Sequence, residues 1–80
     1  MGYHKRKIER GEFGEFSKIK EEFEECQDAI DQNNKVMVLL ELSDMLGAIE
    51  EYCKKYNLTL EDLIEMKNAT KRAFESGSRS

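Results

Sequence analysis

The sequence predicts an all-α protein: a short helical hairpin followed by a third helix, within one domain that spans residues 1–80. Apolar residues recur at spacings of three and four, which is the helical period. No alternating strand pattern and no internal repeat is present. Proline, which interrupts helices, is absent, and most glycines lie near the two ends of the chain, at Gly2, Gly11, Gly14 and Gly77.

The N-terminal sixteen residues are basic and then rich in glycine, with a short helix expected at residues 5–10. Ser17 is a suitable N-cap for the first main helix, which is predicted to run to about Gln32. A narrow apolar stripe follows one face of this helix: Phe16, Ile19, Phe23, Cys26 and Ile30. The pair Asn33-Asn34 then predicts a break.

A second main helix is predicted from about residue 35 to residue 56. Its first half is apolar almost all round, through Val36-Met37-Val38-Leu39-Leu40. A helix that is apolar on more than one face must be covered on more than one side, and one short neighbour cannot do so. We therefore expect the protomers to assemble into an oligomeric four-helix-type bundle, as a homodimer or homotetramer.

The third helix has the clearest start signal in the chain. Thr59 and Asp62 have the spacing of a capping box, and Leu58 and Leu63 occupy the positions of a hydrophobic staple. The helix is predicted to continue to about Phe74, and residues 76–80 are expected to form a flexible tail.

Composition excludes several classes of protein. Seventeen acidic residues against thirteen basic ones give a net charge of −4, which argues against binding a nucleic acid polymer. No run approaches the roughly 20 apolar residues needed to cross a bilayer. With no apparent signal peptide and only Cys26 and Cys53, the expected location is the cytoplasm, and a thiol nucleophile is not expected because no histidine lies near either cysteine.

Two acidic clusters carry the functional information. In the first main helix, Glu22 and Glu25 lie one turn apart on a flank of the apolar stripe. In the second helix, Glu41 and Asp44 are also one turn apart, on a flank shared with apolar residues. If the two helices are antiparallel neighbours, the four carboxylates can converge.

Carboxylates in apolar surroundings need compensation, because an unpaired one costs several kcal/mol. Basic partners, protonation and a divalent cation are the three remedies. The second helix has no lysine or arginine between Lys35 and Lys54. Hard oxygen ligands suit Mg²⁺, or Mn²⁺, whereas zinc is disfavoured because the only histidine, His4, lies outside both helices. The alternative without a metal is that the first cluster forms a solvated helix face and the second is paired to lysines of another subunit.

The order and spacing of these acids resemble a family. Glu21-Glu22-Phe-Glu-Glu25 looks like the Glu-Glu-x-x-Glu helix of the MazG-like, all-α nucleoside triphosphate pyrophosphatases, and Glu41-Leu-Ser-Asp44 looks like their Glu-x-x-Asp helix. The gap between the two motifs has a length that the family uses. The resemblance covers about residues 17–79.

The resemblance implies a Mg²⁺-dependent nucleotide pyrophosphohydrolase that cleaves the bond between the α- and β-phosphates and yields a nucleoside monophosphate and pyrophosphate. It implies metal ligands at Glu22, Glu25, Glu41 and Asp44, with Glu21 helping to orient or deprotonate the attacking water. Phosphate-binding residues are implied in the later part of the chain: Lys67, Asn68, Lys71, Arg72 and Arg79. The alternative for those on the third helix is an ordinary solvated face.

Two other functions remain open from the sequence. The first is a non-catalytic helical oligomerisation or interaction module, in which the acidic residues bind a partner. The second is a relative of the enzymes that binds the metal without turnover.

Overall fold

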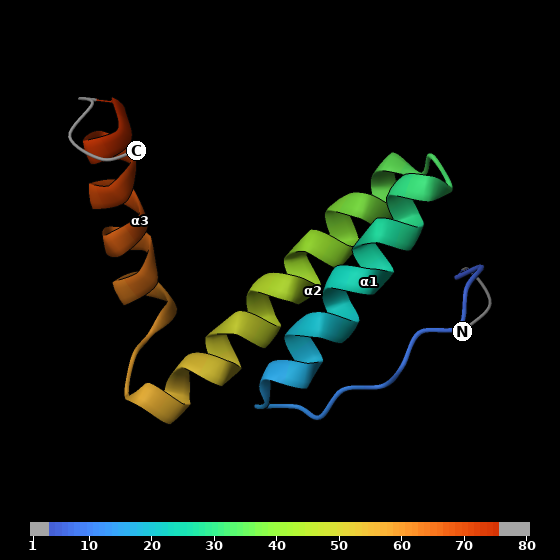
Figure 1. Ribbon diagram of the computed structural model, residues 1–80, viewed down its shortest axis with the longest axis horizontal. Helices are drawn as coiled ribbons and strands as arrows, with labels where there is room; N and C mark the ends of the chain where they lie inside the picture. The colour runs from blue at the N-terminus through green and yellow to red at the C-terminus, as the bar shows by residue number, and fades with distance from the viewer. Residues whose placement is uncertain (1–3, 76–80) are drawn as a thin grey trace.

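The computed structural model describes residues 4–75, with side chains described as far as residue 72, and this part of the chain is helical without any strand. Helix α1 (Phe16–Asp31) and helix α2 (Lys35–Cys53) form an antiparallel hairpin (Figure 1). A single 3₁₀ turn, η1 (Lys54–Tyr56), links α2 to helix α3 (Leu60–Glu75). The predicted all-α class is therefore confirmed, and the predicted tail at residues 76–80 lies outside the described residues.

The sequence signals for the helix ends hold at two places. Asn33 has a left-handed backbone (φ 61°), and the side chain of Asn34 accepts a hydrogen bond from the Met37 amide at 3.1 Å, so the predicted break starts α2. At α3, Thr59 and Asp62 exchange hydrogen bonds of 2.9 and 3.1 Å, which is the expected capping box.

Two local predictions are wrong. Residues 5–10 are not helical but extended, because amides at both ends of this stretch bind side chains of α1: Lys5 N–H donates to Asp28 and Gly11 N–H donates to Glu21. Ser17 does not cap α1, which begins one residue earlier. Its hydroxyl instead accepts a hydrogen bond from the Glu12 amide at 3.0 Å.

The end of the second helix is also earlier than predicted. Regular α2 stops at Cys53, and the remaining three predicted residues form the 3₁₀ turn η1. Asn57 ends that turn in the left-handed conformation (φ 57°).

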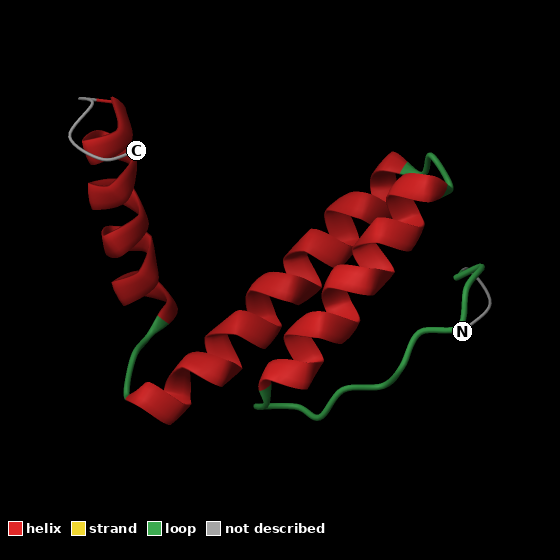
Figure 2. Ribbon diagram, viewed as in Figure 1, coloured by secondary structure: helices red, strands yellow, loops and turns green. Residues whose placement is uncertain are grey.

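Residues 4–12 run back along α1 in an extended path, and a turn at residues 12–15 leads into the helix (Figure 2). Gly11 allows this close approach, because a Cβ atom there would overlap the backbone of Ser17 and Lys18. The segment thereby brings its first described residues alongside the middle of the hairpin.

The buried interior of the hairpin is small and partly acidic. Its apolar members are Cys26, Ala29, Met37, Ala48 and Cys53. Buried among them are four carboxylates: Glu21, Glu22, Asp28 and Glu41. Both cysteines are free and buried, as small core residues.

The apolar stripe predicted on the first main helix lies mostly on the outside. Phe16, Phe23 and Ile30 are each more than half exposed, and only Cys26 of the five predicted residues is buried. The flank beside the stripe faces α2 instead, so the pairing of the hairpin directs Glu22 inward. On α2, Val36 and Leu39 are the most exposed apolar residues.

No helix within residues 4–75 is both long and apolar enough to span a bilayer.

Candidate metal centre

The structure brings carboxylates of α1 and α2 together between the two helices. One cluster joins Glu22 of α1 to Glu41 and Asp44 of α2, with one ligand atom from each residue lying within 4.8 Å of the others. Glu25 belongs to two adjoining clusters of the same tightness, one with Glu21 and Glu22 and one with Glu41 and His4. All five predicted acidic residues thus occupy one continuous site.

Burial differs sharply between the members of the site. Glu22 and Glu41 are only 6% and 2% exposed, and one oxygen of each, Oε1, is buried without a hydrogen-bond partner among the described residues. Such an oxygen is costly to desolvate unless something pairs with it. Asp44, which the sequence placed in apolar surroundings, is instead exposed and opens the cluster to solvent.

Part of the acidic charge has a basic partner that sequence reasoning missed. The ammonium group of Lys18 lies 3.1 Å from Glu21 Oε1 and 3.1 Å from Glu22 Oε2. Burial lowers the pKa of Lys18, but the two carboxylates outweigh burial and raise it. The spacings from Lys18 to these two glutamates, three and four residues on a helix, were visible in the sequence.

The acids of the site differ in their affinity for protons. Burial, the neighbouring Glu21 and the charge of Glu22 raise the pKa of Glu25 to about 7. Burial also raises the pKa of Glu41, with repulsion from Asp44 adding to it and attraction from His4 opposing it. For Glu21, hydrogen bonds from the Gly11 amide and Lys18 outweigh burial and lower the pKa. The pKa of Glu25 therefore lies near neutral pH.

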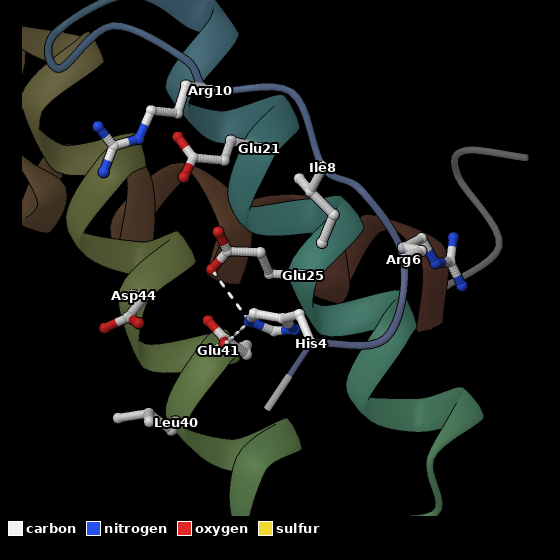
Figure 3. Close-up of a pocket in the computed structure, with 9 residues that line it drawn as sticks. All are labelled: His4, Arg6, Ile8, Arg10, Glu21, Glu25, Leu40, Glu41 and Asp44. Carbon is white, nitrogen blue, oxygen red and sulfur yellow. Dashed lines mark hydrogen bonds and ion pairs between the residues drawn. The ribbon is translucent and has the colours of Figure 1, made fainter. Parts of the chain in front are cut away.

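His4 lies inside the site, although the sequence indicated no role for it. Its Nε2 atom is 3.0 Å from Glu41 Oε2 (Figure 3). Its Nδ1 atom is 3.0 Å from Asp28 Oδ2. His4 does lie outside both helices, as the sequence indicated, but the N-terminal segment still brings its side chain to the acids. Nothing in the local sequence of residues 4–10 signals this contact, because it joins residues 37 positions apart.

A cavity of about 290 Å³ opens over the acidic site. Two arginines of the N-terminal segment, Arg6 and Arg10, line it together with the carboxylates of both helices (Figure 3). Arg6 is paired with Asp31, whereas Arg10 forms no ion pair with the side chains described, residues 4–72. The cavity is thus acidic at its base and carries a basic group at its rim.

The residues expected to bind phosphate lie elsewhere in the protomer. Lys67, Asn68, Lys71 and Arg72 are exposed on α3, which extends away from the hairpin (Figure 1), and none of them lines the cavity. The fifth, Arg79, is outside the described residues. Within one chain, α3 and the acidic site are not brought together.

No protein family, curated protein or solved structure matches the chain.

Proposed function

We propose that the protein is a Mg²⁺-dependent nucleoside triphosphate pyrophosphohydrolase, which cleaves the bond between the α- and β-phosphates. The observation that carries this proposal is the cluster of Glu22, Glu41 and Asp44, with ligand atoms within 4.8 Å of one another and two buried oxygens that lack partners. The resemblance of the two acidic motifs to the MazG-like enzymes supplies the class of reaction.

The donor set fits a hard divalent cation. All three side chains offer carboxylate oxygens, which Mg²⁺ and Mn²⁺ prefer. The exposed Asp44 leaves one side of the site accessible to water and to a phosphate group, as catalysis requires. When bound, the ion would neutralise phosphate charge and lower the pKa of a coordinated water.

The chain itself supplies a group that can take the proton from the attacking water. Glu25 lies beside the cluster with a pKa of about 7, which suits a general base at neutral pH. Glu21 is less suited to the water-activating role that the resemblance implies, because its carboxylate is already engaged by Gly11 and Lys18. We therefore assign proton transfer to Glu25.

The rim of the cavity suits the phosphates of a substrate. Arg10 has no ionic partner among the residues whose side chains are described and lines the same cavity as Glu41 and Asp44, so it can pair with a phosphate oxygen. A cavity of about 290 Å³ is at the lower limit for a ligand pocket of this kind. It accommodates phosphate groups, and the nucleoside must be held partly by other surfaces.

A second copy of the chain is the proposed source of those surfaces. Phe23 and Ile30 on α1 and Val36 and Leu39 on α2 are more than half exposed, and a soluble protomer rarely leaves so much apolar surface uncovered. Pairing two hairpins in a homodimer or homotetramer would cover these faces. It would also allow α3 of one chain, with Lys67 and Lys71, to approach the acidic site of another.

The test is pyrophosphate release from a panel of nucleoside triphosphates in the presence of Mg²⁺. Glu41→Gln is expected to abolish release while remaining helical, because it removes a ligand and keeps the side-chain volume. Glu24→Gln is the matched control, since Glu24 is a glutamate of the same hairpin that belongs to none of the three clusters.

The rival function is a non-catalytic helical interaction module. It is favoured by the exposed apolar faces and by the partial neutralisation of the acids by Lys18 and His4. Absence of pyrophosphate release with every nucleotide, or equal release by wild type and Glu41→Gln, would reject the enzyme and support the interaction module.

A further inference from the structure

The position of His4 gives the site a nitrogen ligand. Its Nε2 atom lies 3.0 Å from Glu41 Oε2 and 3.6 Å from Glu25 Oε1, and the dashed lines in Figure 3 mark both contacts. The side chain of Glu41 is almost fully buried, and its second oxygen, Oε1, has no partner among the described residues. One imidazole and two carboxylates therefore surround a point that is open on the side of the cavity.

The other ring nitrogen of His4, Nδ1, is bound by Asp28. His4 Nδ1 and Asp28 Oδ2 are 3.0 Å apart, and the same oxygen accepts hydrogen bonds from the Lys5 amide and from Gln32 Nε2. A carboxylate oxygen that already receives two N–H donors acts as an acceptor toward the imidazole as well. The hydrogen of the imidazole must then lie on Nδ1, and the lone pair of Nε2 faces Glu25 and Glu41 whenever the ring is neutral.

This arrangement is the one that proteins use behind metal-bound histidines. A carboxylate on the far nitrogen fixes the tautomer and the orientation of the ring, and makes the near nitrogen a better ligand. Asp28 is 2% exposed, and its other hydrogen bonds keep it from following the imidazole if the ring moves.

The distances agree with ligands around one ion. With metal–ligand bonds of about 2.0–2.2 Å, adjacent ligand atoms are about 3 Å apart in an octahedron and about 3.4 Å apart in a tetrahedron. The two distances from His4 Nε2, 3.0 and 3.6 Å, are close to these values. One ligand atom from each of the three residues lies within 4.8 Å of the other two.

We propose that His4, Glu25 and Glu41 bind a divalent transition-metal ion of the Zn²⁺ class, with Asp28 as the positioning residue. Imidazole is a poor ligand for Mg²⁺ and a good one for Zn²⁺ and Co²⁺, so the donor set selects the transition metals. Three protein ligands leave a further coordination position, which faces the cavity.

The transition-metal site and the Mg²⁺ cluster require different sets of residues. Both sites use Glu41, but only the transition-metal site needs His4 and Asp28, and its existence does not depend on the proposed hydrolysis. One consequence does rest on the proposed function: an ion bound to Glu25 removes the proposed general base, so Zn²⁺ would oppose pyrophosphate release.

The experiment measures Zn²⁺ binding to the full, untagged chain by calorimetry, together with the visible absorption of the Co²⁺ complex. Wild type is expected to bind one ion per chain. His4→Gln is expected to weaken binding by about 100-fold or more, and Asp28→Asn by about 10- to 100-fold, which is the usual effect of losing an outer carboxylate. Glu24→Gln should leave both readouts unchanged, and His4→Gln should keep the Mg²⁺-induced rise in melting temperature.

A direct measurement on wild type avoids any question of folding in the variants. His4 is the only histidine of the chain, so its two ring proton signals in the NMR spectrum are unambiguous. Zn²⁺ should shift them in proportion to the occupancy measured by calorimetry. Zn²⁺ binding that leaves these signals unmoved, or an unchanged Kd in His4→Gln, would overturn the proposal, whether or not the protein hydrolyses nucleotides.

Discussion

Replacement of Glu41 by glutamine tests the acidic site through stability alone. A ligand that binds only the folded protein stabilises it by RT ln(1 + [L]/Kd), which is about 2.7 kcal/mol when Mg²⁺ is present at 100 times its Kd. For a domain of this size, 1 kcal/mol corresponds to about 4–8 °C in melting temperature. Wild type should therefore melt about 10–20 °C higher under those conditions.

The variant should lose most of this shift. A ligand loss that raises the Kd by about 100-fold leaves the same Mg²⁺ concentration near the new Kd, where the stabilisation is only about 0.4 kcal/mol, or about 2–3 °C. Glu41 is 2% exposed and contributes to two of the three clusters, so other oxygens have little room to replace it.

The metal-free stability of the variant should change much less. Glu41→Gln removes repulsion from Glu22 and Asp44, whose nearest ligand atoms are within 4.8 Å. It also weakens the charged hydrogen bond to His4, worth about 1.5–3 kcal/mol. These two effects have opposite signs and partly offset each other.

The assay is thermal unfolding followed by circular dichroism, with and without Mg²⁺ at constant ionic strength, on wild type, Glu41→Gln and the control Glu24→Gln. The control should show the full Mg²⁺ shift. If Glu41→Gln also keeps the full shift, or if Mg²⁺ does not stabilise wild type, the carboxylates between α1 and α2 do not form a Mg²⁺ site.

Three further predictions concern other parts of the molecule. Because the pKa of Glu25 is raised to about 7, the metal-free fold binds more protons than the unfolded chain and loses stability as pH rises from about 4.5 through 7. An ion beside Glu25 competes with that proton, so the Mg²⁺-induced rise in melting temperature should be larger at pH 8 than at pH 6. An equal rise at the two pH values would contradict the assignment of Glu25 as the group that titrates beside the ion. Arg10→Gln should raise KM for the nucleotide by about 10- to 100-fold, as expected for a lost charged hydrogen bond, while leaving the Mg²⁺ shift intact; an unchanged KM would remove Arg10 from the substrate site. Leu39→Glu places a charge on a leucine that is 67% exposed in the protomer; light scattering should show a smaller particle than wild type if this face lies between chains, and an unchanged mass would exclude that interface.

The sequence predicted those parts of the fold that depend on neighbouring residues. The Asn33-Asn34 break and the Thr59–Asp62 capping box are local hydrogen-bonding patterns, and both are found where expected. The convergence of Glu22, Glu41 and Asp44 also follows from local spacing, once two helices pair in an antiparallel hairpin. Helical periodicity and a short connection were sufficient for this prediction.

The parts that the sequence did not predict depend on distant contacts. Residues 4–15 have no apolar period, and their path is set by hydrogen bonds to Glu21 and Asp28, which no local pattern encodes. The apolar stripe of α1 also did not indicate which side of the helix faces α2. The apolar side is the better candidate for burial in an isolated helix, but here Phe23 and Ile30 remain open and Glu22 faces α2.

Gly11 offers a way to act on this site from outside it. A methyl group at position 11 would collide with the start of α1 and push the preceding residues off the hairpin, without altering any charged or coordinating side chain. Gly11→Ala should therefore withdraw the histidine and both arginines together while leaving the helical acids in place. A single uncharged substitution can thus separate the contribution of the hairpin carboxylates from that of the residues in the N-terminal segment.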